Sequence, residues 1–292
     1  MANSIGKESE IIVERNAYIR LDNLGNRAIR RIATMKQQVY SCLLGIPLIV
    51  IFLIVWEVAP RIGILNPIFF PPFSKVIQAF QTLVATGELQ SHIGISLFRA
   101  LTGFVLGAVL AIPLGFLMGR YRLFEQVTDL WIQGLRNTSQ FALLPVFIML
   151  FGIGEVSKIA ITFYASIWFL LINTISGVKG VDSLLIKAAI SMGTSDRDLF
   201  KNVIFPASFP SIVSGARLAI KSALMAVIGA EMLAAKSGLG YFVQNSQLMY
   251  RIPEMYAGIL VLTILGLLLN YVLVWIEKRA TSWKTQTENL NF

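Results

Sequence analysis

Few side chains in this sequence could carry catalysis or hold a metal. His92 is the single histidine and Cys42 the single cysteine, so neither a Cys/His metal cluster nor a disulfide within the chain can form. No nucleophile stands beside a plausible base. The glycines of residues 152–158 do not have the spacing of a phosphate-binding loop. We therefore expect no catalytic residue, no bound metal and no cofactor held by this chain itself.

Polar side chains that interrupt long apolar stretches are the better candidates for function. Ser139 and Gln140 open one such stretch, Asn173 lies near the end of another, and Lys221 and Glu231 lie inside a third. Such groups need a partner or water in a bilayer. We predict that they line a solute pathway, in which Lys221 would suit an anion. The alternatives are that the first three cap helix ends and that the two charged residues are paired or reach the membrane surface.

The composition indicates that these residues are positioned by membrane-spanning helices. Hydrophobic residues make up 55% of the chain and charged residues only 14%, against about 25% charged residues in an ordinary soluble domain. About 20 helical residues cross a bilayer. Stretches of that length and low charge occur at residues 39–56, 100–119, 137–154, 159–178, 209–233 and 255–276. The prediction is an all-α polytopic membrane protein of about six transmembrane helices.

The distribution of basic residues predicts how the chain is oriented. The net charge of +9 could suggest nucleic acid in a soluble protein, but here the basic residues lie between apolar stretches. Most of them fall on the side that holds both termini, which places that side in the cytoplasm. We therefore expect a cytoplasmic tail over residues 1–38, one membrane domain over 39–280, and a second cytoplasmic tail over 281–292, with membrane lipid and no nucleic acid as partner.

Two further patterns predict local structure. An amphipathic stretch over residues 74–86 favours a helix on the outer side, before the second span. Within that span, small residues recur at every fourth position and form a ridge that lets another helix approach closely. This pattern favours packing within the chain over a dimer interface. The ridge consists of Gly103, Gly107, Ala111, Gly115 and Gly119.

The loop over residues 181–206 predicts a docking element on the cytoplasmic side. Its apolar residues fall at helical spacing and would form an exposed apolar face on a helix too short to span the membrane. Gly193 would end that helix, and Ser195 and Asp196 could cap a following helix that ends at Pro206. The alternative is a helix lying on lipid. The face comprises Leu184, Leu185, Ala188, Ala189 and Met192.

This loop resembles the EAA loop of binding-protein-dependent ABC importer permeases. The family pattern is Glu-Ala-Ala, three residues, Gly, nine residues, an aliphatic residue, one further residue, then an aliphatic residue and Pro. The spacing is the same here, although Lys187 stands in place of Glu and Phe205 in place of the usual Leu. Further similarity in residues 144–159, 172–182, 230–233 and 238–241 resembles the branch that serves nitrate, aliphatic sulfonates, taurine and bicarbonate. Residues 137–140 differ from the proline-rich segment common there.

The resemblance implies an inner-membrane subunit that works with several partners. These are two ATPase subunits that bind ATP and Mg, a second copy of the permease, and an external solute-binding protein. The ATPases would dock on the loop at Leu184, Leu185, Ala188, Ala189, Met192, Gly193 and Pro206. The expected function is ATP-driven import of a small anion. The alternatives are a secondary transporter driven by an ion gradient and a permease for a solute resembling a thiamine precursor.

Overall fold

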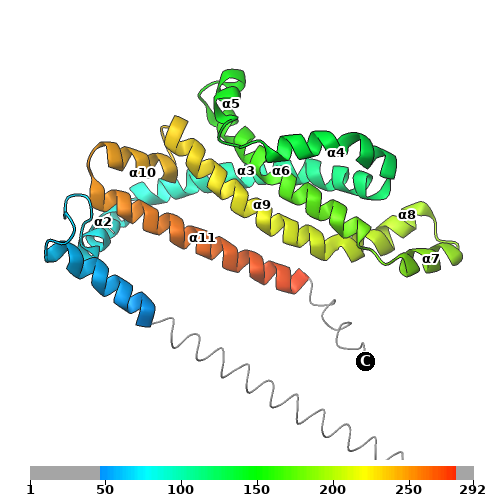
Figure 1. The fold of residues 1–292 in the computed structure, drawn as a ribbon, viewed down its shortest axis with the longest axis horizontal. Helices are drawn as coiled ribbons and strands as arrows, with labels where there is room; N and C mark the ends of the chain where they lie inside the picture. The colour runs from blue at the N-terminus through cyan, green and yellow to red at the C-terminus, as the bar shows by residue number, and fades with distance from the viewer. Residues whose placement is uncertain (1–46, 281–292) are drawn as a thin grey trace, which may run out of the picture. The chain divides into compact units, whose positions relative to one another are not determined.

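A computed structural model describes residues 47–280, and all regular elements in that range are helices. The predicted all-α class is therefore confirmed. The predicted tails over residues 1–38 and 281–292, and residues 39–46 of the first predicted span, lie outside the described residues. A helix over residues 47–61 precedes the labelled helices of Figure 1. These are α2 (Phe73–Ala85), α3 (Glu88–Arg120), α4 (Arg122–Asn137), α5 (Leu144–Phe151), α6 (Glu155–Lys179), α7 (Ser183–Ser191), α8 (Asp196–Leu199), a π-helical turn (Phe200–Ile204), α9 (Phe205–Ala234), α10 (Leu239–Leu248) and α11 (Ile252–Ala280).

The chain divides into two compact units, Met1–Phe73 and Ser74–Phe292. The described part of the first unit is built around Trp56. Its indole nitrogen donates a hydrogen bond to the Pro71 carbonyl oxygen at 3.1 Å, and its ring packs against Phe70 and Phe73. These contacts fold the segment after the helix back onto that helix. The predicted single domain over residues 39–280 stays a prediction.

The second unit is a bundle in which α6 packs along both α3 and α9. Helix α11 packs on α9 and leaves most of its apolar surface exposed, as expected of a helix that faces lipid. Helices α7 and α8 lie at one end of this bundle and α10 at the other (Figure 1). Helix α2 confirms the helix expected over residues 74–86.

Four helical stretches within residues 47–280 are long and apolar enough to cross a membrane. They contain α3, α6, α9 and α11, and each of these overlaps one of the predicted spans. The count of six is not confirmed by length and composition. The predicted span over residues 39–56 is only partly described, and the predicted span over 137–154 has a different structure.

The predicted continuous helix over residues 137–154 is wrong. Helix α4 ends at Asn137, residues 138–143 form turns, and α5 is only eight residues long. Pro145 in the first turn of α5 cannot donate a backbone hydrogen bond to a preceding turn, which favours a helix start there. Gly152 then ends α5 with a positive φ of 78°. The helical pattern of α4 was missed because its apolar residues are interleaved with charged ones.

The ridge of small residues on α3 packs against α6 of the same chain, as the pattern favoured. A Cβ atom added at Gly103 would lie 2.6 Å from the Cβ of Thr162, and one added at Gly115 would lie 2.6 Å from the Cβ of Thr174. Such distances leave no room for a side chain on α3. The ridge is therefore what allows the two helix backbones to approach along their length.

The predicted helix end at Pro206 is also wrong. The helical backbone passes from α8 through the π-helical turn into α9, and Pro206 lies in the first turn of α9. A proline is tolerated there because the π-helical turn already interrupts the regular hydrogen-bond ladder. Proline therefore marks a change of helical winding here and not the end of the helix.

Candidate functional site

Helix α7 ends just before Gly193, as its sequence predicts, and begins after Asp182. The Asp182 carboxylate accepts a hydrogen bond from the Leu184 amide at 2.8 Å, which caps the helix. Gly193 follows the helix with φ of 77°, a conformation that favours glycine. The hydroxyl of Ser195 then accepts from the Asp198 amide and caps α8. The loop is therefore a defined pair of short helices.

The two faces of α7 differ sharply in exposure. Leu184 is 70% exposed and Met192 78%, and Leu185 and Ala188 are also exposed. Ala189 is only 5% exposed, because it packs into an apolar cluster at the ends of the long helices. That cluster also contains Phe116 of α3, Val178 of α6, Leu199 of α8, Ile204 of the π-helical turn and Ile212 of α9. The loop is thus anchored by one face and presents apolar side chains with the other.

A hollow of about 450 Å³ lies where the turns after α4 meet α6 and α9. It brings together Gln140 and Asn173, two of the predicted pathway residues, although they are 33 positions apart in the sequence. Arg136 at the end of α4 and Ser222 on α9 also line it. Tyr164 and Trp168 of α6 contribute aromatic walls, with their ring centroids 5.5 Å apart. Both polar and aromatic groups therefore face this space.

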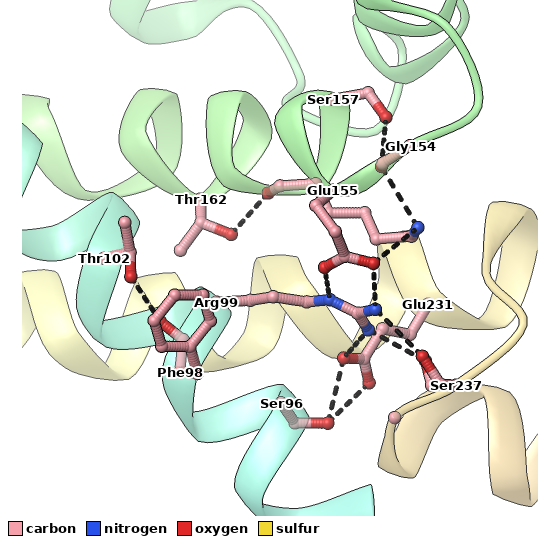
Figure 2. A network of polar contacts seen from close by, with 12 residues as sticks. Ser96, Phe98, Arg99, Thr102, Gly154, Glu155, Ser157, Thr162, Glu231 and Ser237 are labelled. Atoms are coloured by element: carbon pink, nitrogen blue, oxygen red, sulfur yellow. Dashed lines mark hydrogen bonds and ion pairs between the residues drawn. The ribbon is translucent and has the colours of Figure 1, made fainter.

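A buried network of charged residues joins α3, α6 and α9 at the end of the bundle near α10. Arg99 of α3 is 1% exposed and Glu231 of α9 is fully buried. The Arg99 Nη1 donates to Glu231 Oε1 at 2.7 Å and to the Ser237 carbonyl oxygen at 2.8 Å. Its Nε and Nη2 donate to the two oxygens of Glu155 at 2.5 and 2.6 Å. Figure 2 shows the guanidinium lying between the two carboxylates.

The second carboxylate oxygen of Glu231 also has hydrogen-bond partners. Ser96 donates its hydroxyl proton to the carboxylate, with distances of 2.7 and 2.9 Å to the two oxygens, and the Gly240 amide donates to Oε2 at 3.0 Å. The Leu239 amide donates in turn to the Ser96 hydroxyl oxygen at 2.8 Å. Residues 230–233 and 238–241, two of the segments that carried the resemblance, therefore meet in one hydrogen-bonded unit.

The other predicted pathway residues do not gather at the hollow. Lys221 is next to Ser222 on α9 but lines a separate hollow between α9 and α11. Glu231 lies in the buried network, and Ser139 is exposed in the turns before α5 and is absent from the lining residues of both hollows. A pathway role for all five residues stays a prediction. The structure brings only Gln140 and Asn173 together.

The comparisons with known proteins identify the family. A family model described as "Binding-protein-dependent transport system inner membrane component" matches residues 23–282. The chain belongs to this family. It is therefore the permease subunit of an ABC importer, and it is not the catalytic subunit.

Individual relatives agree with this assignment. The permease is 41% identical to a probable ABC transporter permease protein of Brucella abortus strain 2308, over 72% of this chain and 84% of the relative. It is 36% identical to the putative aliphatic sulfonates transport permease protein SsuC of Escherichia coli strain K12, over 78% and 87%. A chain in an inward-facing crystal structure of the MetNI methionine ABC transporter has the same fold, with a TM-score of 0.59 and 17% identity over 68% of this chain and 98% of that one.

Sequence reasoning missed the two arginines on which these sites depend. Neither Arg99, which precedes the predicted span over residues 100–119, nor Arg136, in the last turn of α4, is among the predicted site residues. A signal for Arg99 was present, since a carboxylate such as Glu231 in an apolar stretch needs a cation from another helix. No comparable signal marks Arg136, because its position beside the hollow depends on where α4 ends in space.

Proposed function

We propose that this permease imports a small anion, delivered by an external solute-binding protein, and that α7 is the element on which an ATPase subunit docks. The observation that carries the proposal is the two-faced geometry of α7. Its outer face exposes Leu184, Leu185, Ala188 and Met192, while Ala189 ties the opposite face to the ends of α3, α6 and α9. A force applied to the outer face would be transmitted to three long helices at once.

An exposed apolar helix face supports docking by a protein partner. Leaving side chains such as Leu184 and Met192 in water is unfavourable, by about 25 cal/mol for each Å² of apolar surface. A groove on a partner that accepts an amphipathic helix would remove this surface from water. In this proposal the α7 end of the bundle faces the cytoplasm, where ATP is available, and two permease copies pair with two ATPase subunits.

An anionic solute is supported by two observations. The Escherichia coli relative is named for aliphatic sulfonates, and the hollow described above contains Arg136 and no acidic residue among its described lining residues. A solute without an anionic group, such as the thiamine-precursor alternative within the family, would leave the guanidinium of that arginine without an oxyanion partner.

The docking proposal is tested with the double variant Leu184→Asp/Met192→Asp. Both side chains are exposed, so the variant should fold normally, while two charges on the docking face should oppose burial by an apolar groove. We expect the amount of ATPase subunit that co-purifies with the permease to fall at least tenfold, and ATP-driven uptake into proteoliposomes to fall with it. The matched control is Ile190→Asp, an exposed apolar residue of α7 outside the predicted face.

Two results would count against the proposal. If the double variant retained its ATPase subunit and its uptake, α7 would not be the docking element. If wild-type proteoliposomes took up solute in response to an ion gradient with no ATPase present, the chain would act as a secondary transporter. Uptake that requires both ATP and the solute-binding protein would support delivery of the solute by that protein.

A further inference from the structure

The hollow beside Arg136 has an unusual supply of free hydrogen-bond donors. Within residues 47–280, the side chains of Arg136, Gln140 and Ser222 make neither a hydrogen bond nor an ion pair with another residue. They come from three different parts of the fold: the end of α4, the turns before α5, and α9. Most polar side chains nearby are already engaged; the Asn173 amide nitrogen, for example, donates to the Phe169 carbonyl oxygen at 2.8 Å. Three unengaged donors from separate elements therefore share one space.

The charge of this space favours an anion. Arg136 brings a permanent positive charge, and the described residues that line the hollow include no aspartate or glutamate. Lys221, which precedes Ser222 on α9, lines a different hollow. A guanidinium presents its N–H groups as a planar fork that matches two oxygens of one anion. An oxyanion that accepts from Arg136 could also accept from the Gln140 amide and the Ser222 hydroxyl.

The backbone beside the hollow provides independent support. Residues 138–143 separate α4 from α5 and have no helical hydrogen-bond ladder. Non-helical backbone in a membrane domain is tolerated where it is buried in protein or lines a water-filled space. Interrupted helices in transporters often mark where a solute binds. The interruption and the free donors coincide, because Thr138 and Gln140 belong to the turns and line the hollow.

We propose that this hollow binds the oxyanion group of the imported solute, with Arg136 as its charged contact and Gln140 and Ser222 as further donors. This inference rests on the proposed function and specifies the substrate class. It assigns specificity to Arg136, which lies outside the pathway residues predicted from the sequence. The aromatic walls formed by Tyr164 and Trp168 would pack against an apolar part of the solute.

The test measures binding directly in the assembled protein. The full-length permease with its ATPase subunits is placed in lipid nanodiscs and titrated with methanesulfonate in a calorimeter, with tetramethylammonium as a cation of similar size. We expect methanesulfonate to bind and tetramethylammonium not to bind. Arg136→Gln should weaken methanesulfonate binding at least tenfold. Arg136→Lys, which keeps the charge but loses the fork, should weaken it less, and Ser222→Ala should weaken it by a few-fold.

The matched control is Arg122→Gln at the other end of the same helix, because Arg122 is exposed and outside the hollow. Its affinity should stay within twofold of the wild type. The inference is overturned if the wild type binds no methanesulfonate, if Arg136→Gln binds it normally, or if both glutamine variants lose affinity equally. The last result would indicate only a general effect of net charge.

Failure of this inference can be separated from failure of the proposed function. The Arg136 variants should retain their ATPase subunits, since Arg136 is far along the chain from α7 and absent from the cluster that anchors it. The Leu184→Asp/Met192→Asp variant should lose its ATPase subunits while the permease still binds methanesulfonate. Retention of the ATPase subunits by the Leu184→Asp/Met192→Asp variant would contradict the docking proposal alone, and a wild type that keeps its subunits but binds no methanesulfonate would contradict the oxyanion site alone.

Discussion

Arg99 and Glu231 form an ion pair of 2.7 Å between α3 and α9, although they are 132 positions apart in the sequence. Both side chains are almost completely removed from solvent, at 1% and 0% exposure. A charge in such a place is tolerated only when it is paired and its remaining hydrogen-bonding groups are satisfied. Glu155, Ser96, Ser237 and Gly240 provide those contacts. The pair therefore fastens three helices and the α9–α10 turn to one another.

Removing one member of this pair should be strongly destabilising. Arg99→Met leaves the Glu231 carboxylate buried without its cation, which is expected to cost about 3–5 kcal/mol in the free energy of unfolding. The double variant Arg99→Met/Glu231→Met removes both charges and should recover part of that loss. Unfolding of the purified permease by heat or by denaturing detergent, followed by circular dichroism, measures both.

The matched control for Arg99 is Arg217→Met. Arg217 donates to Glu277 at 2.8 Å, but the two side chains are 33% and 21% exposed, so this pair is much less completely desolvated than Arg99 and Glu231. We expect a loss of about 1 kcal/mol or less for Arg217→Met. If Arg99→Met and Arg217→Met lowered the free energy of unfolding equally, the Arg99–Glu231 pair would contribute no more to stability than a partly exposed ion pair.

The neighbouring residues Ala188 and Ala189 should respond very differently to the same substitution. Ala189 is 5% exposed in the cluster that anchors α7, whereas Ala188 is exposed. Ala189→Asp would place an unpaired carboxylate in an apolar cluster and should destabilise the loop by several kcal/mol, seen as faster cleavage by an added protease. Ala188→Asp should leave cleavage unchanged and weaken ATPase co-purification. Fast cleavage of both variants would mean that α7 is not held by one face only.

Close packing of α3 on α6 can be tested at Gly115. A Cβ atom added there would lie 2.6 Å from the Cβ of Thr174, which is buried and whose hydroxyl donates to the Leu170 carbonyl oxygen. Gly115→Ala should therefore cost about 1–3 kcal/mol through overpacking. Gly134→Ala on α4 is the control, since no atom beyond the neighbouring backbone of its own helix lies within 4 Å of the added Cβ. It should be neutral or stabilising by up to about 1 kcal/mol, because alanine favours helices.

Much of this architecture follows from the sequence because its signals are local. The spans predicted at residues 100–119, 159–178, 209–233 and 255–276 lie inside α3, α6, α9 and α11, since an apolar run bounded by charge indicates a membrane helix without any knowledge of its neighbours. The glycine spacing of α3 predicted close packing for the same reason. Gly193 likewise marks the end of α7 by its own conformational preference.

The features that could not be predicted depend on contacts between distant segments. The residues around Arg99 do not indicate that Glu231 and Glu155 are its ion-pair partners, because many pairings of charged residues are possible in a chain of this length. The hollow exists because α4 ends at Asn137 and the following turns meet α6 and α9. Ala189 reads as part of an apolar stripe, and only its packing against Val178 and Ile204 shows that it faces inward.

Gly238 lies in the α9–α10 turn, next to the carboxyl group of Glu231. We therefore expect a substitution at Gly238 to disturb the Arg99–Glu231 ion pair and to lower the free energy of unfolding. Its φ of 108° and ψ of 166° lie in a region reserved almost entirely for glycine, and an added Cβ would overlap the Glu231 carboxyl group. Gly238→Ala should cost about 1–3 kcal/mol in backbone strain and a further loss from displacing Glu231. Gly87→Ala, at φ of 76° and ψ of 0° in the left-handed helical region with open space around the added atom, gives a lower limit for the strain at a positive φ without overlap.

A double-variant cycle separates the two losses at Gly238. In a Glu231→Ala background the overlap is gone, so Gly238→Ala should cost only its strain and the two changes should be less than additive by about 1 kcal/mol or more. The Gly87→Ala change has no such overlap and should be additive with Glu231→Ala. The free energies come from the same unfolding experiment in all variants. Additivity of Gly238→Ala with Glu231→Ala would mean that the turn and the ion pair are energetically independent, despite the 3.0 Å hydrogen bond from Gly240.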